Sequence, residues 1–320
     1  MDPLSDVLSL LKPRSYMSKG FEAGGAWSVQ FPDHYQSIKC NAIITGECWL
    51  AVDSVPGAVH LKAGDCFVLP AGRPFRLASD LSIPPVDAGP IFQQARDGGT
   101  VSCNGGKDFF LTGSRFAVSG THASTLLAML PPVVHISKES DKASLRWAVE
   151  RMMEELREQR PGGLLIAQHM AHMMLVQALR MHVDNAAEGE SSGWFAALAD
   201  RQLSKALNAM HENPAHRWTV QTLAEQAGMS RSVFSQKFKL AVGSAPLEYL
   251  TRWRMLLAGD RLTNSKEPVS AVALSLGYES ESAFSTAFKR TLGVHQGSTG
   301  SSKRADILLR QREVPNGCAE

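Results

Sequence analysis

Two short stretches of this chain repeat one arrangement of side chains. The first is "AGMSRSVFSQKF" (227–238) and the second is "LGYESESAFSTAFKR" (276–290), and each passes from a Gly to a Ser and then to two Phe residues spaced i and i+4. On a helix, that spacing places both rings on one face. We expect each pair of rings to point into a core, with Val233 beside the first pair. The pairs are Phe234 with Phe238 and Phe284 with Phe288.

The polar side chains on the opposite face of each helix have the chemistry to read nucleic acid. Short polar side chains on an exposed helix can reach base edges in a major groove, and Lys or Arg beside them can hold phosphates. Gln236 is the residue best suited to paired hydrogen bonds with an adenine edge. The candidate DNA-contacting residues are Arg231, Ser232, Ser235, Gln236 and Lys239 in the first stretch, and Ser280, Glu281, Ser282, Ser285, Thr286, Lys289 and Arg290 in the second.

A short apolar helix is expected before each stretch, in "TVQTLAEQAG" (219–228) and "PVSAVALSLG" (268–277). A glycine would end each of these helices in the left-handed conformation, and a serine would cap the helix that follows. Helix, glycine turn and capped helix form the helix-turn-helix pattern. An all-α bundle with polar solvent faces is the alternative, but it gives no reason for two copies in register. The punctuating residues are Gly228, Ser230, Gly277 and Ser280.

A third predicted helix connects the two copies. The segment "SAPLEYLTRWRMLLAGDRL" (244–262) carries apolar residues on one face. A helix of about 17 residues spans about 25 Å, and successive major-groove faces lie about 34 Å apart. One chain could therefore hold two recognition helices about one DNA turn apart.

The N-terminal half has a different pattern. Residues 38–80 are rich in Val, Ile, Leu and aromatics, with Gly or Pro every 7–10 residues, and 86–120 continue this less clearly. Short strands in this rhythm are typical of a sandwich or barrel. From about 140 the period becomes helical. An amphipathic helix is predicted over 141–160, ended by Pro161-Gly162-Gly163, and a second, more apolar helix over 164–183.

These patterns divide the chain into four predicted parts. Residues 1–183 form a β-rich domain that includes the helices at about 140–183. A small, polar, acidic linker follows at 184–193, then an all-α domain at 194–293 with both helix-turn-helix units. The tail, 294–320, is expected to be disordered.

Charge is divided unequally between the halves. Residues 1–192 carry 17 Lys or Arg against 20 Asp or Glu, whereas residues 193–304 carry 14 against 8. A basic C-terminal half favours a polyanionic partner there. No apolar run approaches the roughly 18–20 residues of a bilayer span, and the N-terminus lacks the basic region of a signal peptide. We therefore expect a cytoplasmic protein without a membrane partner.

Five cysteines, odd in number and scattered, do not form a disulfide framework or the C-x₂-C spacing of a zinc site. We expect the four in the strand-rich domain to be small buried hydrophobes. Sensing of redox state or of an effector by a thiolate is the alternative. These four residues are Cys40, Cys48, Cys66 and Cys103.

The segment from 218 to 293, with "GYESESAFSTAFKR" and "PLEYLTRWRM", resembles the DNA-binding domain of the AraC/XylS family of bacterial transcriptional regulators. The front of the chain, with "GECWLAVD" and "AGDCFVLPAGRPFRLASD", resembles a subgroup with a cupin-like sensor domain. The chain departs from the family after the last helix. There, "GVHQGSTGSSKR" replaces the usual Gly-x-x-Pro-x-x-Tyr-Arg ending.

The resemblance implies an α+β protein of two domains. The first is a cupin-like sensor barrel with linker and dimerisation helices at about 140–183, and the second contains two helix-turn-helix units. It implies a sequence-specific regulator that binds double-stranded DNA, responds to a small molecule or stress, works with RNA polymerase and forms a homodimer. Its place would be the bacterial cytoplasm, on the nucleoid. No cofactor is expected.

The alternative is a cupin-type enzyme with a helical appendage that no longer binds DNA. Cupins often hold a metal with two or three His and a Glu, but Phe75 stands where a ligand His is expected, and no His-x-His occurs in 38–80. His169 and His172 could form part of a metal site, although a helix interface explains them better. We therefore expect no metal site and no catalytic residues.

Overall fold

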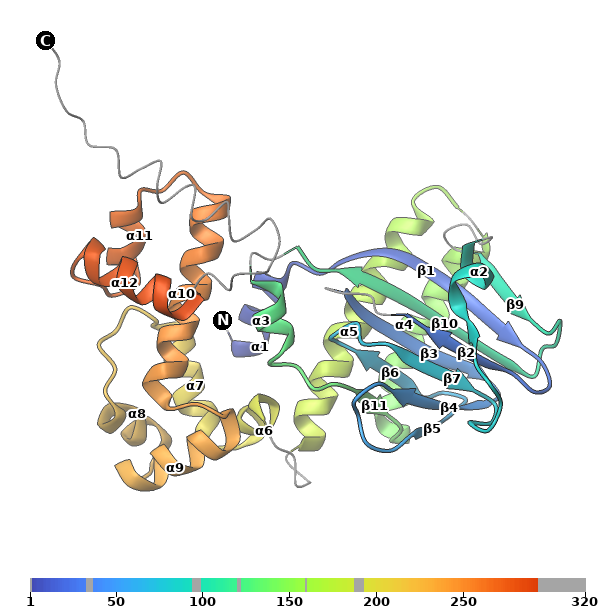
Figure 1. The fold of residues 1–320 in the computed structure, drawn as a ribbon, viewed down its shortest axis with the longest axis horizontal. Coiled ribbons are helices and arrows are strands. Elements are labelled where there is room, and N and C mark those ends of the chain that lie inside the picture. Colours follow the sequence, from blue (N-terminus) through green and yellow to red (C-terminus); the bar gives the residue numbers. More distant parts are fainter. Residues whose placement is uncertain are drawn as a thin grey trace, which may run out of the picture. The chain divides into compact units, whose positions relative to one another are not determined.

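The computed structural model describes residues 2–32, 37–93, 99–119, 122–158, 160–186 and 193–292. Its internal contacts divide the chain into two compact units (Figure 1). The sheet unit comprises the described residues within Lys12–Ser119 and Ala123–Ser191. The helical unit comprises those within Met1–Leu11, Gly120–His122 and Ser192–Glu320. Within these ranges, no helix combines the length and apolarity that crossing a bilayer requires.

The strands described in the sheet unit form two sheets rather than one closed barrel. The six-stranded sheet has the order β11-β6-β3-β10-β1-β9 and the five-stranded sheet the order β5-β4-β7-β2-β8. Most neighbouring strands are antiparallel, and β1–β9 and β2–β8 are parallel. The strands are β1 (Arg14–Ala23), β2 (Ser28–Phe31), β3 (Ser37–Thr45), β4 (Glu47–Val52), β5 (Val59–Lys62), β6 (Cys66–Leu69), β7 (Phe75–Ala78), β8 (Val86–Asp87), β9 (Thr100–Cys103), β10 (Phe109–Ala117) and β11 (Val134–Ile136).

Both sheets contribute to one apolar core. Phe21, Phe67 and Phe109 come from the six-stranded sheet, and Leu50 and Phe75 from the other. Alternate residues along each strand point to opposite faces, so the other face of the six-stranded sheet needs a separate cover. The β-rich, cupin-like architecture expected from the sequence is therefore present as two packed sheets.

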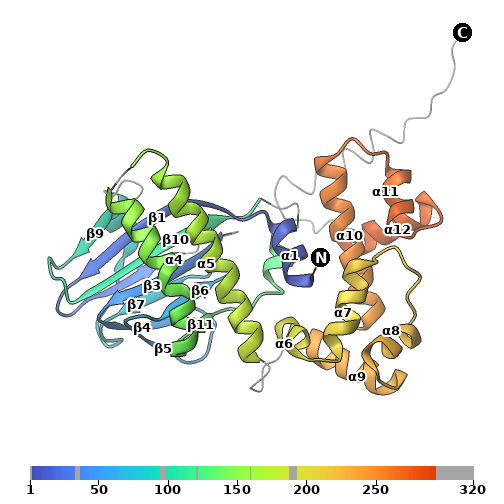
Figure 2. The same cartoon turned by 180° about the vertical axis from the view of Figure 1, so that it is seen from behind.

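Two long helices supply that cover. The helix α5 (Gly163–Ala186) contacts β1, β3, β6, β10 and β11, and α4 (Glu139–Glu158) packs along α5 (Figure 2). Both helices were predicted from their periodicity. The predicted linker at 184–193 begins inside α5, which continues to Ala186, and residues 187–192 lie outside the described ranges, as does the predicted tail. Two short helices, α2 (Ala88–Gln93) and α3 (Ala123–Leu127), complete the sheet unit.

The helical unit is built from α1 and the helices after residue 193. Its core is centred on aromatic side chains, among which Phe234, Phe238 and Phe284 are fully buried. The long helix α10 contacts α9, α11 and α12. The helices are α1 (Pro3–Leu11), α6 (Trp194–Ala199), α7 (Leu203–Glu212), α8 (Val220–Ala227), α9 (Arg231–Val242), α10 (Pro246–Asn264), α11 (Val269–Ser275) and α12 (Glu281–Leu292).

The first helix of the chain packs in the helical unit, against α7. The sequence patterns had grouped these N-terminal residues with the β-rich domain. Nδ1 of His211 lies 3.0 Å from Oδ2 of Asp6, and Nε2 of His211 lies 2.7 Å from Oη of Tyr249. The indole of Trp194 donates to the same hydroxyl at 3.0 Å. A buried hydrogen-bonded chain therefore joins α1, α7, α10 and α6.

Candidate nucleic-acid interface and ligand cavity

The first helix-turn-helix consists of α8 and α9. Thr219 caps α8, accepting a hydrogen bond from the backbone N–H of Thr222 at 3.1 Å. Gly228 ends α8 with φ of 62°, a left-handed conformation that costs a glycine little. Ser230 then caps α9 by accepting from the N–H of Val233 at 3.4 Å. These local signals, all expected from the sequence, fix where α9 begins.

The second helix-turn-helix consists of α11 and α12 and follows the same plan. Ser280 accepts from the N–H of Ala283 at 3.2 Å, and Phe284 and Phe288 turn inward. Gly277 has φ of 82°, and a Cβ there would lie 2.3 Å from the carbonyl oxygen of Ala215. Glycine is therefore required at this turn for its conformation and for close packing.

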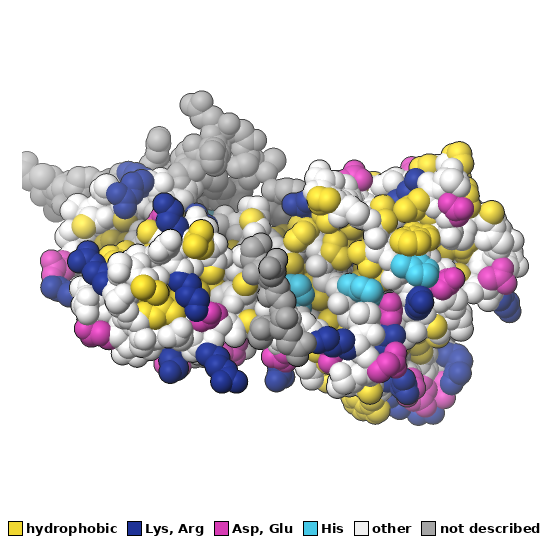
Figure 3. Space-filling view, turned by 90° about the horizontal axis from the view of Figure 1, so that it is seen from below, with side chains coloured by type: hydrophobic (Ala, Val, Ile, Leu, Met, Phe, Trp, Pro, Cys, Tyr) yellow, Lys and Arg dark blue, Asp and Glu magenta, His cyan; other side chains and the backbone are white. Residues whose placement is uncertain are grey.

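Most of the predicted contact residues are exposed on one side of their helix. The sequence also placed Ser235 and Ser285 outward, and the structure leaves both half-buried. Figure 3 views the helical unit from the side of α8 and α9, where Lys and Arg side chains are interspersed with uncharged ones. The exposed members are Arg231, Ser232, Gln236 and Lys239 on α9, and Glu281, Ser282, Thr286, Lys289 and Arg290 on α12, with Ser280 at its cap.

One residue of the first recognition helix was misplaced by sequence reasoning. Val233 was expected in the core beside Phe234, but its side chain is 54% exposed. Neighbouring residues of a helix point about 100° apart, so burial of Phe234 turns Val233 outward. Its counterpart after the second cap, Ala283, is also exposed.

Some polar groups on these helices already have partners. Thr286 donates from its hydroxyl to the carbonyl of Ser282 at 2.9 Å, and Ser280 is occupied as a cap. Lys237, which the sequence did not single out, lies 2.5 Å from Asp200 and ties α9 to the turn before α7. Gln236 makes no side-chain hydrogen bond to any described residue, so its amide remains available to a base.

Arg254 of α10 fixes the loop between α7 and α8. It donates to the carbonyls of Pro214 at 2.6 Å and His216 at 2.8 Å. Arg217 in that loop pairs with Glu279 in the turn before α12. The two helix-turn-helix units are thus connected through the loop as well as through α10.

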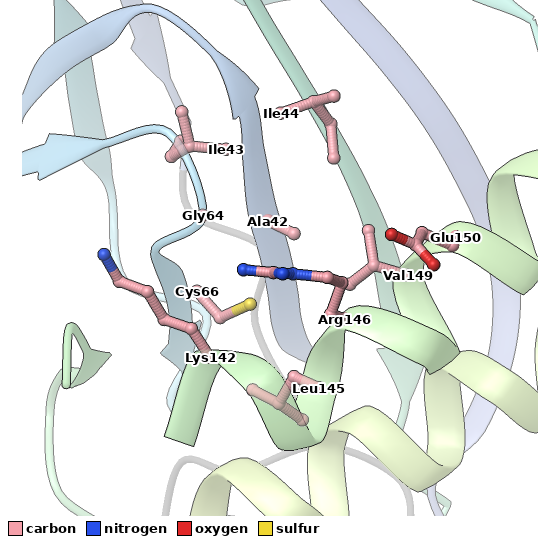
Figure 4. Close-up of a pocket in the computed structure, with 10 residues that line it drawn as sticks. All are labelled: Ala42, Ile43, Ile44, Gly64, Cys66, Lys142, Leu145, Arg146, Val149 and Glu150. Carbon is pink, nitrogen blue, oxygen red and sulfur yellow. The ribbon is translucent and has the colours of Figure 1, made fainter. Parts of the chain in front are cut away.

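The sheet unit contains a cavity of about 190 Å³ between the six-stranded sheet and α4 (Figure 4). Its wall is largely apolar, and the Arg146 guanidinium extends across it toward Cys66 (Figure 4). Arg146 forms no ion pair with a described residue. The lining residues are Ala42, Ile43, Ile44, Gly64, Cys66, Lys142, Leu145, Arg146, Val149 and Glu150.

Asp65 anchors α4 beside this cavity. Its carboxylate lies 2.8 Å from Nζ of Lys142 and 2.9 Å from Nε2 of His135, and it accepts from the N–H of Lys62 at 3.0 Å. Burial alone would raise the pKa of Asp65, but the hydrogen bonds from Lys142 and His135 outweigh it and lower that pKa. Asp65 therefore stays ionised and holds α4 against the sheet.

The cysteines of the sheet unit differ in exposure. Cys40, Cys48 and Cys66 are buried, and Cys103 is half-buried. Burial raises the pKa of Cys48 and of Cys66 to about 12, and also raises the pKa of Cys40. These thiols are therefore protonated at neutral pH, which favours a packing role over thiolate sensing.

The two histidines considered as metal ligands have other neighbours. Nδ1 of His169 donates a hydrogen bond to the carbonyl oxygen of Leu165 at 2.7 Å, and the ring of His172 packs edge-on against Phe116. Within the described ranges, no group of three or more His, Cys, Asp or Glu residues is placed to hold a metal ion.

Comparison with known proteins gives two family matches. Residues 2–184 match the family described as Cupin, and residues 223–297 match the family described as Helix-turn-helix domain. A protein of Streptomyces antibioticus named as an AraC-like transcription regulator is 45% identical over 93% of this chain and 97% of its own length. One of the same name from Streptomyces lividans is 43% identical over the same shares. The crystal structure of the AdpA DNA-binding domain with a target DNA covers 36% of this chain and 99% of its own, at 32% identity and a TM-score of 0.29.

Proposed function

This chain belongs to the family of AraC-like transcription regulators, and we propose that α9 and α12 read its operator while the sheet unit senses a small molecule or stress. It is a sequence-specific DNA-binding regulator. The observation that carries the proposed site is the pair of serine-capped helices with exposed polar faces. Both follow a glycine turn and both bury two Phe residues.

Selection of bound sequences from a random DNA pool, with the full chain as bait, tests this assignment. A single operator should emerge with two conserved segments about 10 base pairs apart, one for each recognition helix. Phosphate contacts by Arg231 and Arg290 should make affinity fall at least about tenfold between low and physiological salt. A flat salt response or a single conserved segment would contradict the assignment.

We propose the cavity beside α4 as the effector site. The Arg146 guanidinium in a largely apolar cavity suits a small organic anion. The charged oxygens of the anion would accept hydrogen bonds from the guanidinium, and its apolar part would displace water from the cavity. Lys142 already pairs with Asp65 and Glu139, so Arg146 is the available cation. Five lining residues belong to α4, so a bound anion would act directly on that helix.

Thermal unfolding of the full chain with hexanoate or benzoate, and with hexanol or benzyl alcohol as neutral controls, tests the cavity. The carboxylates should raise the melting temperature of the wild type and not that of Arg146→Met. Equal increases in melting temperature with the alcohols would show that the cavity does not recognise the charge of the ligand. An anion that binds but leaves operator affinity unchanged would separate the cavity from regulation.

We propose a homodimer formed through α4 and α5. Both helices leave large apolar side chains open: Trp147 is 60% exposed, Leu164 51% and Leu165 58%. Leu164 and Leu165 are adjacent, and adjoining exposed apolar groups mark interfaces more often than single ones do. The methionines of these helices would adapt to more than one packing arrangement.

The remaining assignments follow from the family rather than from the geometry. We propose that the protein acts with RNA polymerase at promoters on the bacterial nucleoid, in the cytoplasm, and that it catalyses no reaction. Elemental analysis of the purified protein tests the last point. A stoichiometric amount of bound transition metal, together with the absence of salt-dependent DNA binding, would support the cupin-type enzyme instead.

A further inference from the structure

The two recognition helices expose a small apolar side chain at the same position. Val233 on α9 and Ala283 on α12 are each the third residue after the capping serine. The backbone N–H of each donates to that cap, at 3.4 Å from Val233 to Ser230 and at 3.2 Å from Ala283 to Ser280. The two side chains therefore hold equivalent places on their helices.

Packing in the protein core does not explain why these two positions carry apolar side chains. The residue that follows each one, Phe234 or Phe284, is fully buried, and Val233 itself is 54% exposed. Isolated exposed apolar residues are common on protein surfaces, but the same feature appears here in both copies. By contrast, the position two residues earlier differs in charge between the copies: it is Arg231 on α9 and Glu281 on α12.

The first turns of a recognition helix are the part that meets base edges. In the major groove, the 5-methyl group of thymine is the apolar feature that a small aliphatic side chain can contact. Val233 lies next to Ser232 and three residues before Gln236, both exposed and able to hydrogen-bond to bases. A thymine methyl beside those polar contacts is the partner that matches an exposed valine.

We propose that Val233 and Ala283 each pack against the 5-methyl group of one thymine, so that each half of the operator carries a thymine preference set by van der Waals contact. This inference rests on DNA recognition through α9 and α12. It adds two specificity residues that have no hydrogen-bonding group in their side chains. The two thymines should lie about one DNA turn apart, because α9 and α12 are proposed to enter successive segments of the major groove.

Replacement of thymine by deoxyuridine removes only the methyl group and leaves base pairing intact. With the selected operator and the full chain, each thymine is replaced in turn and affinity is measured. Loss of one buried methyl contact should weaken binding about fourfold. Two thymines, one in each half, should show this loss, whereas uracil elsewhere should have little effect.

Variants assign each thymine to its residue. Val233→Ser should reduce the uracil effect in one half and keep it in the other, and Val233→Ile should retain both. Ala283→Ser should reduce only the second effect. Leu240→Ala is the matched control, because Leu240 is 76% exposed at the far end of the same helix, and it should leave both effects intact.

Two results would overturn the inference about the thymine methyl groups, and both differ from the result that would refute DNA recognition through α9 and α12. If replacement of thymine by uracil weakens binding of Val233→Ser as much as it weakens binding of the wild type, Val233 touches no thymine methyl. If no thymine responds to loss of its methyl although the operator binds tightly, neither residue reads one. Absence of any selected operator would instead refute recognition through α9 and α12.

Discussion

Asp6 and His211 are separated by 205 positions in the chain, yet Oδ2 of Asp6 lies 3.0 Å from Nδ1 of His211. The Tyr249 hydroxyl receives the indole N–H of Trp194 and lies 2.7 Å from the other histidine nitrogen. Its own hydrogen is then directed to Nε2 of His211, so Nδ1 carries the proton donated to Asp6. The neutral imidazole therefore satisfies every member of this buried chain.

Acid should destabilise the helical unit through His211. Burial lowers the pKa of His211 more than Asp6 raises it, so the folded value lies below the ordinary 6.5. The unfolded chain therefore takes up the proton first. The stabilising effect is complete above pH 6.5 and is lost as pH falls through the folded pKa. Urea unfolding at several pH values should show a steeper loss for wild type than for His211→Gln, and parallel curves would contradict this.

Tyr249→Phe offers a second test of the same chain. It leaves Nε2 of His211 and the indole of Trp194 without their buried partner, which should cost about 1–3 kcal/mol in the free energy of unfolding. A loss well below that range would mean that water replaces the hydroxyl. Unfolding can be followed by tryptophan fluorescence, because Trp194 and Trp253, which stacks on His211, are two of the six tryptophans that give the signal.

Gln236→Ala should impair recognition more than general DNA affinity. An amide paired with adenine contributes about 1–3 kcal/mol of discrimination, so the variant should lose that much on the selected operator and much less on random DNA. Lys239→Ala removes an exposed cation from the same helix and should weaken binding to the operator and to random DNA equally. Equal losses from Gln236→Ala on both would reassign Gln236 to a positioning contact.

Sequence patterns were most reliable where structure is local. The caps Thr219, Ser230 and Ser280 and the turn glycine Gly228 were predicted correctly, because each acts on backbone groups within four residues. Val233 was misplaced because its apolar character was given more weight than its position, which points about 100° away from the buried Phe234 around the helix. The pairing of Asp6 with His211 depends on packing between distant segments, so no local pattern could reveal it.

Light scattering should find the full chain as a dimer at tens of micromolar, as expected if α4 and α5 form the interface. Leu165→Glu would place a charge on the exposed apolar surface and should shift the mass to that of a monomer. Ser102→Glu adds the same charge to an exposed position of β9 and should leave the dimer unchanged. A monomeric wild type would refute the proposal.

Lys39 should make the sheet unit more stable at alkaline pH. Burial, aided by repulsion from Arg115, lowers the pKa of Lys39 to about 7, with its Nζ 4.3 Å from the ring centre of Phe75. Between about pH 7 and 10.5 the unfolded chain holds a proton that the folded chain has lost. Stability therefore rises with pH across that window and is lost as pH falls through it.

Lys39→Met tests this assignment. The variant should flatten the rise and gain about 1 kcal/mol or more at pH 7, whereas Lys107→Met, at an exposed position, should not. Loss of stability in Lys39→Met at pH 7 would instead show that the ammonium is held by its aromatic neighbours.

Alkylation should distinguish the cysteines. Among the four cysteines of the sheet unit, the half-buried Cys103 should react with iodoacetamide first at pH 8. Cys40, Cys48 and Cys66 should react only as the unit unfolds, because their side chains are buried. Mass spectrometry of the labelled peptides identifies the order. Rapid labelling of Cys66 in the folded chain would revive the thiolate-sensing alternative.

The helices α9 and α12 share their caps and buried rings but not their exposed charges. Arg231 on one corresponds to Glu281 on the other, and Leu240 corresponds to Arg290. We therefore expect one subunit to read two unlike half-sites, so that the stretch of operator under it lacks internal twofold symmetry. Inverting such an operator within a promoter would turn the bound protein end for end, so the same sequence in the opposite direction would present a different face to the transcription start.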